Sequence, residues 1–157
     1  MECSIPKQFF RLFLIVLAIN INSTSCSYTT YPTLCFTSLA SHASFIQTSP
    51  KLLAHAALNV TLSTAKSTSA TMFQLSKSLL MKPREAEAMQ DCLEELSDSV
   101  DELRRSIAEM GRIKLSNFQL TMSDLQTWVS AALTDESTCS DVFDRNTKNG
   151  KGVRERI

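Results

Sequence analysis

The groups in this 157-residue sequence that could do chemistry are its carboxylates, histidines, serines and cysteines. His42 and His55 are the only histidines, and no H-E-x-x-H pattern or comparable set of zinc ligands surrounds them. The many serines have no nucleophile elbow, and the chain has no glycine-rich phosphate-binding loop. The sequence therefore predicts a protein that is not an enzyme and that uses no metal and no cofactor.

One row of carboxylates stands out in the stretch REAEAMQDCLEELSDSVDELRRSIAEMG. Glu94, Asp98 and Asp101 could suggest the acid pair of a glycosidase. Their steps of four and three place them on one side of a single helix, where they are solvent neighbours, and this favours a solvated face over catalysis. Two interpretations remain: a face that only keeps the protein soluble, or a docking face for a basic partner.

The N-terminus has the basic, apolar and small-polar order of a secretory signal peptide. Lys7 and Arg11 precede the apolar run 12–19, which is shorter than the roughly 20 residues of a membrane span. The alternative is a buried N-terminal helix. We predict a signal peptide at 1–25 and a mature domain at 26–157, and we expect the protein to be secreted and to leave the membrane after cleavage.

Cleavage near Ser25 would remove Cys3 and leave an even number of cysteines, which suggests disulfides in a small secreted chain. The four that remain, which allow three pairings, are Cys26, Cys35, Cys92 and Cys139. The secretory route could also use Asn59, because Asn59-Val60-Thr61 is an acceptor sequence for an N-linked glycan.

Charge is distributed unevenly along the chain. The 16 basic and 16 acidic residues balance overall, but basic residues crowd the stretch 145–156 and leave 26–144 acidic. An acidic body argues against nucleic acid as a partner, because nucleic-acid binding needs cations to neutralise phosphates. A basic protein surface is the better electrostatic match.

Apolar spacing predicts an all-α fold. Pro32, Pro50 and Pro83 each precede a helix-forming stretch, and proline is favoured at the first helical position. A short helix is expected over 33–47 and a long one over 50–80, where the apolar positions are Leu58, Leu62, Ala65, Met72 and Leu79. The clearest pattern alternates steps of three and four through Ala86, Met89, Leu93, Leu96, Val100, Leu103, Ile107 and Met110.

Capping signals predict how the last part of the chain is divided. Ser123 with Gln126 matches a capping box, and one face of the helix that follows would carry Leu125, Trp128, Val129 and Ala132. Thr138 with Asp141 matches the same kind of signal. We therefore predict a connecting loop over 112–121, a helix, a break at 134–137 and a second helix.

Three stretches of the chain together resemble the plant invertase/pectin methylesterase inhibitor family: TTYPTLCFTSL, DCLEELSDSVDEL and TWVSAALTDESTCSDVF. The resemblance covers residues 26–143. It implies a four-helix up-and-down bundle with an N-terminal helical hairpin and two disulfides, Cys26–Cys35 and Cys92–Cys139. Members of this family continue with a last bundle helix, and GVRERI resembles its first turn, so we expect that helix to be truncated and the domain to be C-terminally incomplete.

The sequence of the stretch DLQTWVSAALTDE is more similar to the pectin methylesterase inhibitor branch of the family than to the invertase inhibitor branch. The resemblance thus implies an inhibitor in the cell wall or apoplast that blocks the active-site cleft of pectin methylesterase by stoichiometric binding. Similarity to the surface that covers the cleft puts five residues in the contact set: Glu94, Asp98, Asp101, Thr138 and Asp141. Two alternatives stay open, namely an inhibitor of cell-wall or vacuolar acid invertase, and a truncated structural remnant that inhibits neither enzyme.

Overall fold

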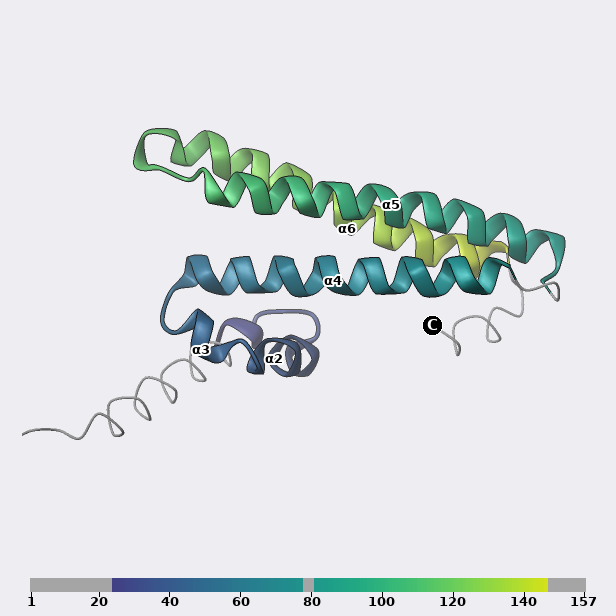
Figure 1. The fold of residues 1–157 in the computed structure, drawn as a ribbon, viewed down its shortest axis with the longest axis horizontal. Helices are drawn as coiled ribbons and strands as arrows, with labels where there is room; N and C mark the ends of the chain where they lie inside the picture. The colour runs from purple at the N-terminus through teal and green to yellow at the C-terminus, as the bar shows by residue number, and fades with distance from the viewer. Residues whose placement is uncertain (1–23, 78–80, 147–157) are drawn as a thin grey trace, which may run out of the picture. The chain divides into compact units, whose positions relative to one another are not determined.

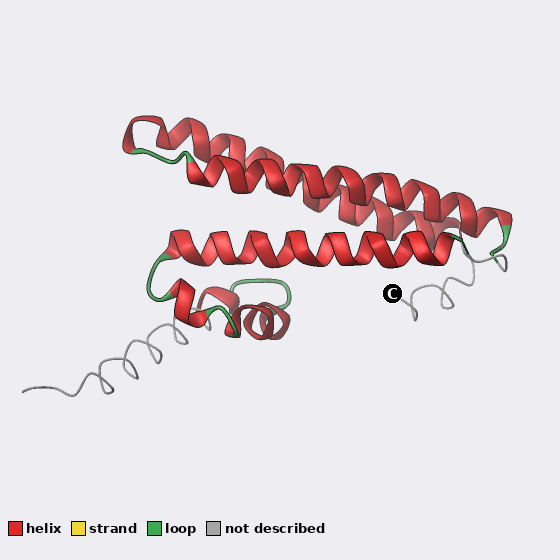
Figure 2. Cartoon of the chain, in the orientation of Figure 1, coloured by secondary structure: helices red, strands yellow, loops and turns green. Residues whose placement is uncertain are grey.

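The computed structural model describes the backbone of residues 24–77 and 81–146, and the side chains as far as residue 142. Within these residues the fold is all-α, as the sequence predicted, with helices joined by short loops and no strand (Figure 2). The predicted signal peptide lies almost entirely outside the described residues, as do Leu79 and the stretch 147–157, where the truncated helix was expected. The chain divides into two compact units, one ending at Val60 and the other starting at Thr61.

The first unit contains two short helices, α2 (Pro32–Ala40) and α3 (Ala43–Ile46), and the start of α4 (Pro50–Ser76) (Figure 1). Its core is made of Cys26, Leu39, Ile46 and Ala56, with Phe36 and Leu53 packed against it. The disulfide Cys26–Cys35 joins the segment before α2 to that helix.

The prediction of one helix over 33–47 was wrong, because the chain turns at Ser41 and His42 between α2 and α3. Both residues are weak helix formers, and the backbone N–H of His42 bonds the Leu39 carbonyl oxygen in a tight turn. Gln47 then adopts a positive φ of 49°, which ends α3. The next helix starts at Pro50, where the Leu52 N–H donates to the Ser49 hydroxyl oxygen.

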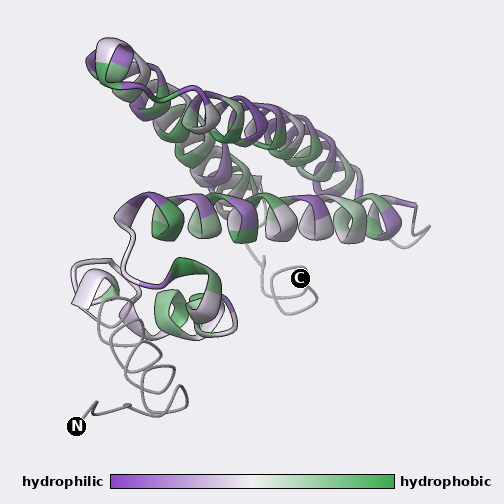
Figure 3. Cartoon of the chain, turned by 60° about the vertical axis from the view of Figure 1, so that its left-hand side comes forward, coloured by the Kyte–Doolittle hydropathy of each residue, from purple (hydrophilic) through white to green (hydrophobic). Residues whose placement is uncertain are grey.

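The second unit contains the end of α4 together with α5 (Pro83–Gly111), the 3₁₀ turn η1 (Leu115–Asn117) and α6 (Phe118–Asn146). Helices α5 and α6 form an antiparallel hairpin and lie side by side (Figure 1). In Figure 3 hydrophobic and hydrophilic residues alternate along each long helix, as expected for helices buried on one side. The core of this unit comprises Met72, Ala88, Met89, Cys92, Leu96 and Val142.

The buried side of α5 is rotated slightly from the predicted apolar stripe. Ala86 is exposed, whereas Ala88, Cys92, Ser99 and Ser106 are almost completely buried. Two of these small residues contact α6: the Ser99 hydroxyl bonds Glu136, and the disulfide Cys92–Cys139 draws Cys92 into the interface.

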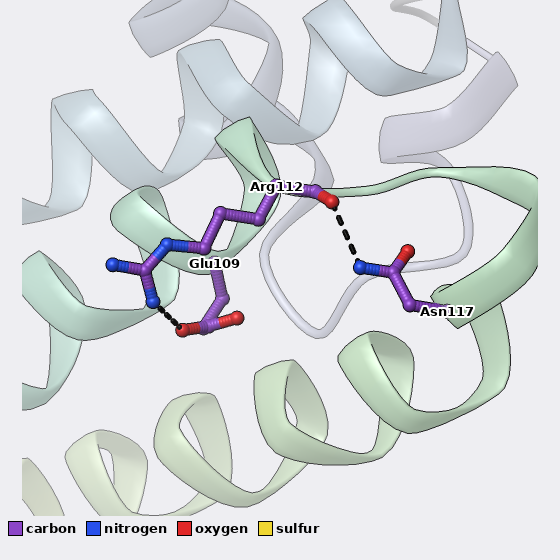
Figure 4. Close-up of polar contacts among 3 residues, drawn as sticks. All are labelled: Glu109, Arg112 and Asn117. Atoms are coloured by element: carbon purple, nitrogen blue, oxygen red, sulfur yellow. Dashed lines mark hydrogen bonds and ion pairs between the residues drawn. The ribbon is translucent and has the colours of Figure 1, made fainter.

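The turn between α5 and α6 is held by polar contacts around Asn117 (Figure 4). Its side-chain amide donates to the Arg112 carbonyl oxygen at 3.0 Å, and its Oδ1 accepts from the Lys114 N–H at 2.7 Å. Arg112 also reaches back to Glu109, with Nη1 and Oε1 2.7 Å apart. The reversal is therefore complete by Asn117, and the predicted loop over 112–121 was too long because α6 already begins at Phe118.

The predicted break at 134–137 is wrong, because α6 is continuous from Phe118 to Asn146. The hydroxyl of Thr138 donates to the Thr134 carbonyl oxygen, and that of Thr134 donates to the Ser130 carbonyl oxygen, both at 2.9 Å. A threonine that bonds one turn back lies inside a helix, whereas one that caps a helix receives a bond from a later N–H. Thr138 is thus no N-cap, and neither is Ser123, five residues after the start of α6.

Candidate partner-binding surface on helices α5 and α6

The three carboxylates predicted to form an acidic row are exposed on α5, as their spacing requires. Asp101 makes an ion pair with Arg104, one turn further on, in which Nη1 and Oδ1 are 2.6 Å apart. Both side chains are more than half exposed, and such a pair contributes little to stability. The pair does reduce the negative charge at this end of the row, so the surface is most acidic around Glu94 and Asp98.

The other two predicted contact residues lie on α6, on either side of Cys139. Asp141 is exposed, whereas Thr138 is half-buried and its hydroxyl is engaged by the Thr134 carbonyl. The disulfide to Cys92 fixes this part of α6 against the part of α5 that carries Glu94.

The predicted contact set therefore has two parts. Glu94, Thr138 and Asp141 are each within two residues of a disulfide cysteine, so they share one end of the hairpin. Asp101 follows Cys92 by nine residues, which places it about 13 Å further along α5 at a rise of about 1.5 Å per residue. A partner that touches all five residues must cover both helices and about two turns of α5, from Glu94 to Asp101.

A second group of polar residues lies between the helices and was missed by the sequence analysis. Glu95, Ser99, Glu102 and Ser106 follow one another at steps of four, three and four along α5, parallel to the apolar stripe. Ser99 and Ser106 are fully buried, and both glutamates are half-buried. This spacing was the available signal, because four polar residues in helical register next to a core stripe mark a polar strip at its edge.

Helix α6 adds two half-buried carboxylates to this strip, Asp135 and Glu136. The Ser99 hydroxyl donates to Glu136 Oε1 over a long 3.4 Å. Burial raises the pKa of Glu136, and the charge of Asp135 acts in the same direction, while the Ser99 hydrogen bond opposes them. Burial also raises the pKa of Glu95, which faces Asp135 and the neighbouring acids of its own helix.

Glu102 of α5 and Asp135 of α6 interact across the two helices. Glu102 Oε2 and Asp135 Oδ2 are both shielded from solvent, and neither receives a hydrogen bond from a donor among the described residues. Burial is the largest cause that raises the pKa of Glu102. A hydrogen bond to Asp135 and the negative charges of Asp135 and Asp98 raise it further. Two carboxylates can form that hydrogen bond only when one of them carries a proton.

Trp128, which the sequence places on the apolar face of its helix, is half-buried on α6. The Arg105 guanidinium of α5 lies over its indole ring, 4.7 Å from the centroid. The contact is a cation–π interaction between the two helices, worth about 0.5–2 kcal/mol depending on its exposure.

The histidines and the glycan acceptor lie in the first unit and at the start of α4. The Asn59 side chain is exposed, and its Nδ2 donates to the His55 carbonyl oxygen at 2.8 Å. The His55 ring in turn lies 6.0 Å from that of Phe45. In the part of the chain that the structure describes, no group of three or more metal-ligand side chains comes together.

No helix within 24–77 or 81–146 has both the length and the apolar character needed to cross a bilayer.

Comparison with known proteins gives consistent matches over most of the sequence. The profile of the plant invertase/pectin methylesterase inhibitor family matches residues 20–157. A protein of Arabidopsis thaliana named Pectinesterase inhibitor 11 is 46% identical over 150 residues, covering 89% of this chain and 73% of that protein. The 21 kDa protein of Daucus carota is 40% identical, with all of this chain and 86% of the relative aligned.

A relative of another kind is the Arabidopsis thaliana protein named Pectinesterase 2. It is 33% identical over 120 residues, which cover 75% of this chain but only 20% of that protein. No solved structure gave a significant match.

Proposed function

The chain belongs to the plant invertase/pectin methylesterase inhibitor family, and from this premise we propose that it inhibits pectin methylesterase by binding the enzyme stoichiometrically and covering its active-site cleft. The observation that carries the proposal is the 46% identity, over most of the chain, to a protein named a pectinesterase inhibitor. The match to a fifth of Pectinesterase 2 adds support, since it associates this type of domain with that enzyme in a single chain.

Acid invertase is the alternative target, because the family description names both enzymes. The experiment is to assay the purified protein against a pectin methylesterase and an acid invertase, with increasing inhibitor at fixed enzyme. Complete inhibition of the esterase at an equimolar ratio, with invertase unaffected, is the expected result. Inhibition of invertase alone would refute the proposal, and inhibition of neither enzyme would favour the non-inhibitory alternative.

We place the enzyme contact on the α5–α6 surface, with Glu94, Asp98, Asp101, Thr138 and Asp141 as contact residues. The support is electrostatic: the exposed acidic row suits a basic surface on the partner, and complementary charge accelerates association. The disulfide Cys92–Cys139 supports the same placement, since it holds the two helices in a fixed register near Glu94 and Asp141.

The acidic row gives a direct test. In the triple variant Glu94→Gln, Asp98→Asn, Asp101→Asn, stability should change little, because exposed substitutions are usually within about 0.5 kcal/mol each. Association with the esterase should slow at low ionic strength, and the difference from wild type should shrink as salt screens the charges. The measurement is the association rate across ionic strength, with melting curves for both proteins.

The matched control retains the charges and changes only side-chain length, in the variant Glu94→Asp, Asp98→Glu, Asp101→Glu. It should associate at close to the wild-type rate. If the neutral triple variant is as fast as wild type at low salt, the row is only a solvated face and these three residues leave the contact set.

We also propose that residues 1–25 are removed as a signal peptide, that 26–157 are secreted to the cell wall, and that Asn59 carries a glycan. The support is the order of charges and apolar residues at the N-terminus and the exposure of the Asn59 side chain. Expressed in plant cells, the protein should appear in the medium starting at Cys26, and a peptide N-glycosidase should reduce its apparent mass. An Asn59→Gln variant that still shows the mass change would exclude this site.

A further inference from the structure

The polar strip between α5 and α6 holds carboxylates that the proposed function does not use. Glu102 of α5 and Asp135 of α6 each direct an oxygen into a region shielded from solvent, and no donor among the described residues reaches these two atoms. A buried carboxylate oxygen without a donor is costly, and two of them from facing helices repel each other as well. The arrangement is unfavourable if both groups are charged.

A single proton removes both costs. When either carboxyl group is protonated, its O–H can donate to the other, so that one hydrogen bond joins the two carboxyl groups. A bond of this kind to a charged acceptor is shorter and stronger than one between neutral groups. The proton comes from the solvent and is released to it again when the pH rises.

The neighbouring charges do not offer another solution. Asp98 on the same helix adds negative charge, which raises the pKa of Glu102 further. The positive charge of Arg105 lowers that pKa, but it is the smallest of the contributions. The Arg105 guanidinium lies over the Trp128 ring, where it is held by a different contact. Around Asp135, Glu95 and Glu136 are further half-buried acids, and burial is the main cause that raises the pKa of each.

We propose that Glu102 and Asp135 share one proton and form an acid-stabilised clasp between α5 and α6, which tightens the hairpin in acidic solution and weakens it as the pH rises. The clasp concerns this chain alone and does not depend on which enzyme it binds.

The sign of the effect follows from the direction of the shift. The pKa of Glu102 is raised in the folded protein above that of an unfolded chain, where a glutamate titrates near pH 4. The folded state therefore binds more protons than the unfolded state between these two values, and stability falls as the pH rises through that window. The contribution is complete below about pH 4 and is lost above the raised pKa.

The test compares equilibrium urea unfolding at about pH 5 and about pH 7. In wild type the unfolding midpoint should be higher at the acidic pH. In Glu102→Gln the amide replaces the protonated carboxyl group as a donor to Asp135 at every pH. The difference between the two unfolding midpoints should therefore lose the part that comes from Glu102 and Asp135. Glu87→Gln, which removes an exposed carboxylate from the same helix, should keep the full wild-type difference.

A second variant distinguishes a shared proton from two independent groups. Asp135→Asn should reduce the pH dependence as Glu102→Gln does, and the double variant should reduce it no further than either single variant, because each change removes the same shared proton. Carboxyl carbon NMR should show that the titration of Glu102 moves to lower pH when Asp135 is replaced, because Asp135 is among the causes that raise the pKa of Glu102. A wild-type pH dependence in both single variants, or additive losses in the double variant, would overturn the proposal.

Discussion

Replacing both Cys92 and Cys139 with alanine is expected to lower the free energy of unfolding by about 4 kcal/mol. The two cysteines are separated by 47 residues, so the disulfide restricts a long loop of the unfolded chain. It also joins α5 to α6 inside the core, where Cys92 is fully buried beside Met72. The measurement is equilibrium denaturant unfolding of the oxidised protein and the double variant under identical conditions.

The first unit supplies the matched comparison. Cys26 and Cys35 are separated by only nine residues, so the same chain-entropy relation gives a loss of roughly 2.6 kcal/mol when both become alanine. The ratio of the two losses is the informative quantity, since both variants exchange the same residue types. A larger loss from the short loop than from the long one would contradict loop closure as the main source of the stabilisation.

Leu96→Ala is the second large effect and should cost about 2–5 kcal/mol. Leu96 is only 5% exposed and packs in the core of the second unit with Met72, Met89 and Val142. Truncation removes apolar contacts and leaves a cavity between helices that the disulfide prevents from collapsing freely. Denaturant unfolding measures the loss directly.

The control uses the same chemical change on the exposed side of α6. Leu133 is 59% exposed, so Leu133→Ala should change the free energy of unfolding by about 0.5 kcal/mol or less. Similar losses at the two leucines would mean that Leu133 is covered by another surface in solution, and the assignment of the buried face of α6 would have to change.

Local chemistry in the sequence determined where most helices begin. Pro32, Pro50 and Pro83 each stand at the first position of a helix, as predicted, because proline lacks the N–H that this position leaves unbonded. The three-four spacing from Met89 to Met110 likewise predicted α5, since a single buried side produces that spacing. The two disulfides that the family resemblance implied are present in the structure.

Only the tertiary structure decided whether a capping signal is used. Thr138 and Ser123 have sequence neighbours typical of helix starts, yet both lie inside α6. A threonine side chain can bond a carbonyl one turn back inside a helix or cap the start of a helix, so the local sequence does not decide between these two positions. Packing favours one continuous helix, because α6 lies along α5 and buries Leu125, Ala132 and Val142, which are spread over much of its length.

For the carboxylates too, spacing on one helix predicted some positions, and only the packing of two helices decided others. Spacing on a single helix was enough to place Glu94, Asp98 and Asp101 on the exposed side of α5, since residues three and four apart share a side. It could not show that Asp135, 33 residues beyond Glu102 in the sequence, would meet that side chain between the helices. That encounter depends on the antiparallel register of α5 and α6, which the turn at Asn117 and the disulfide Cys92–Cys139 fix together.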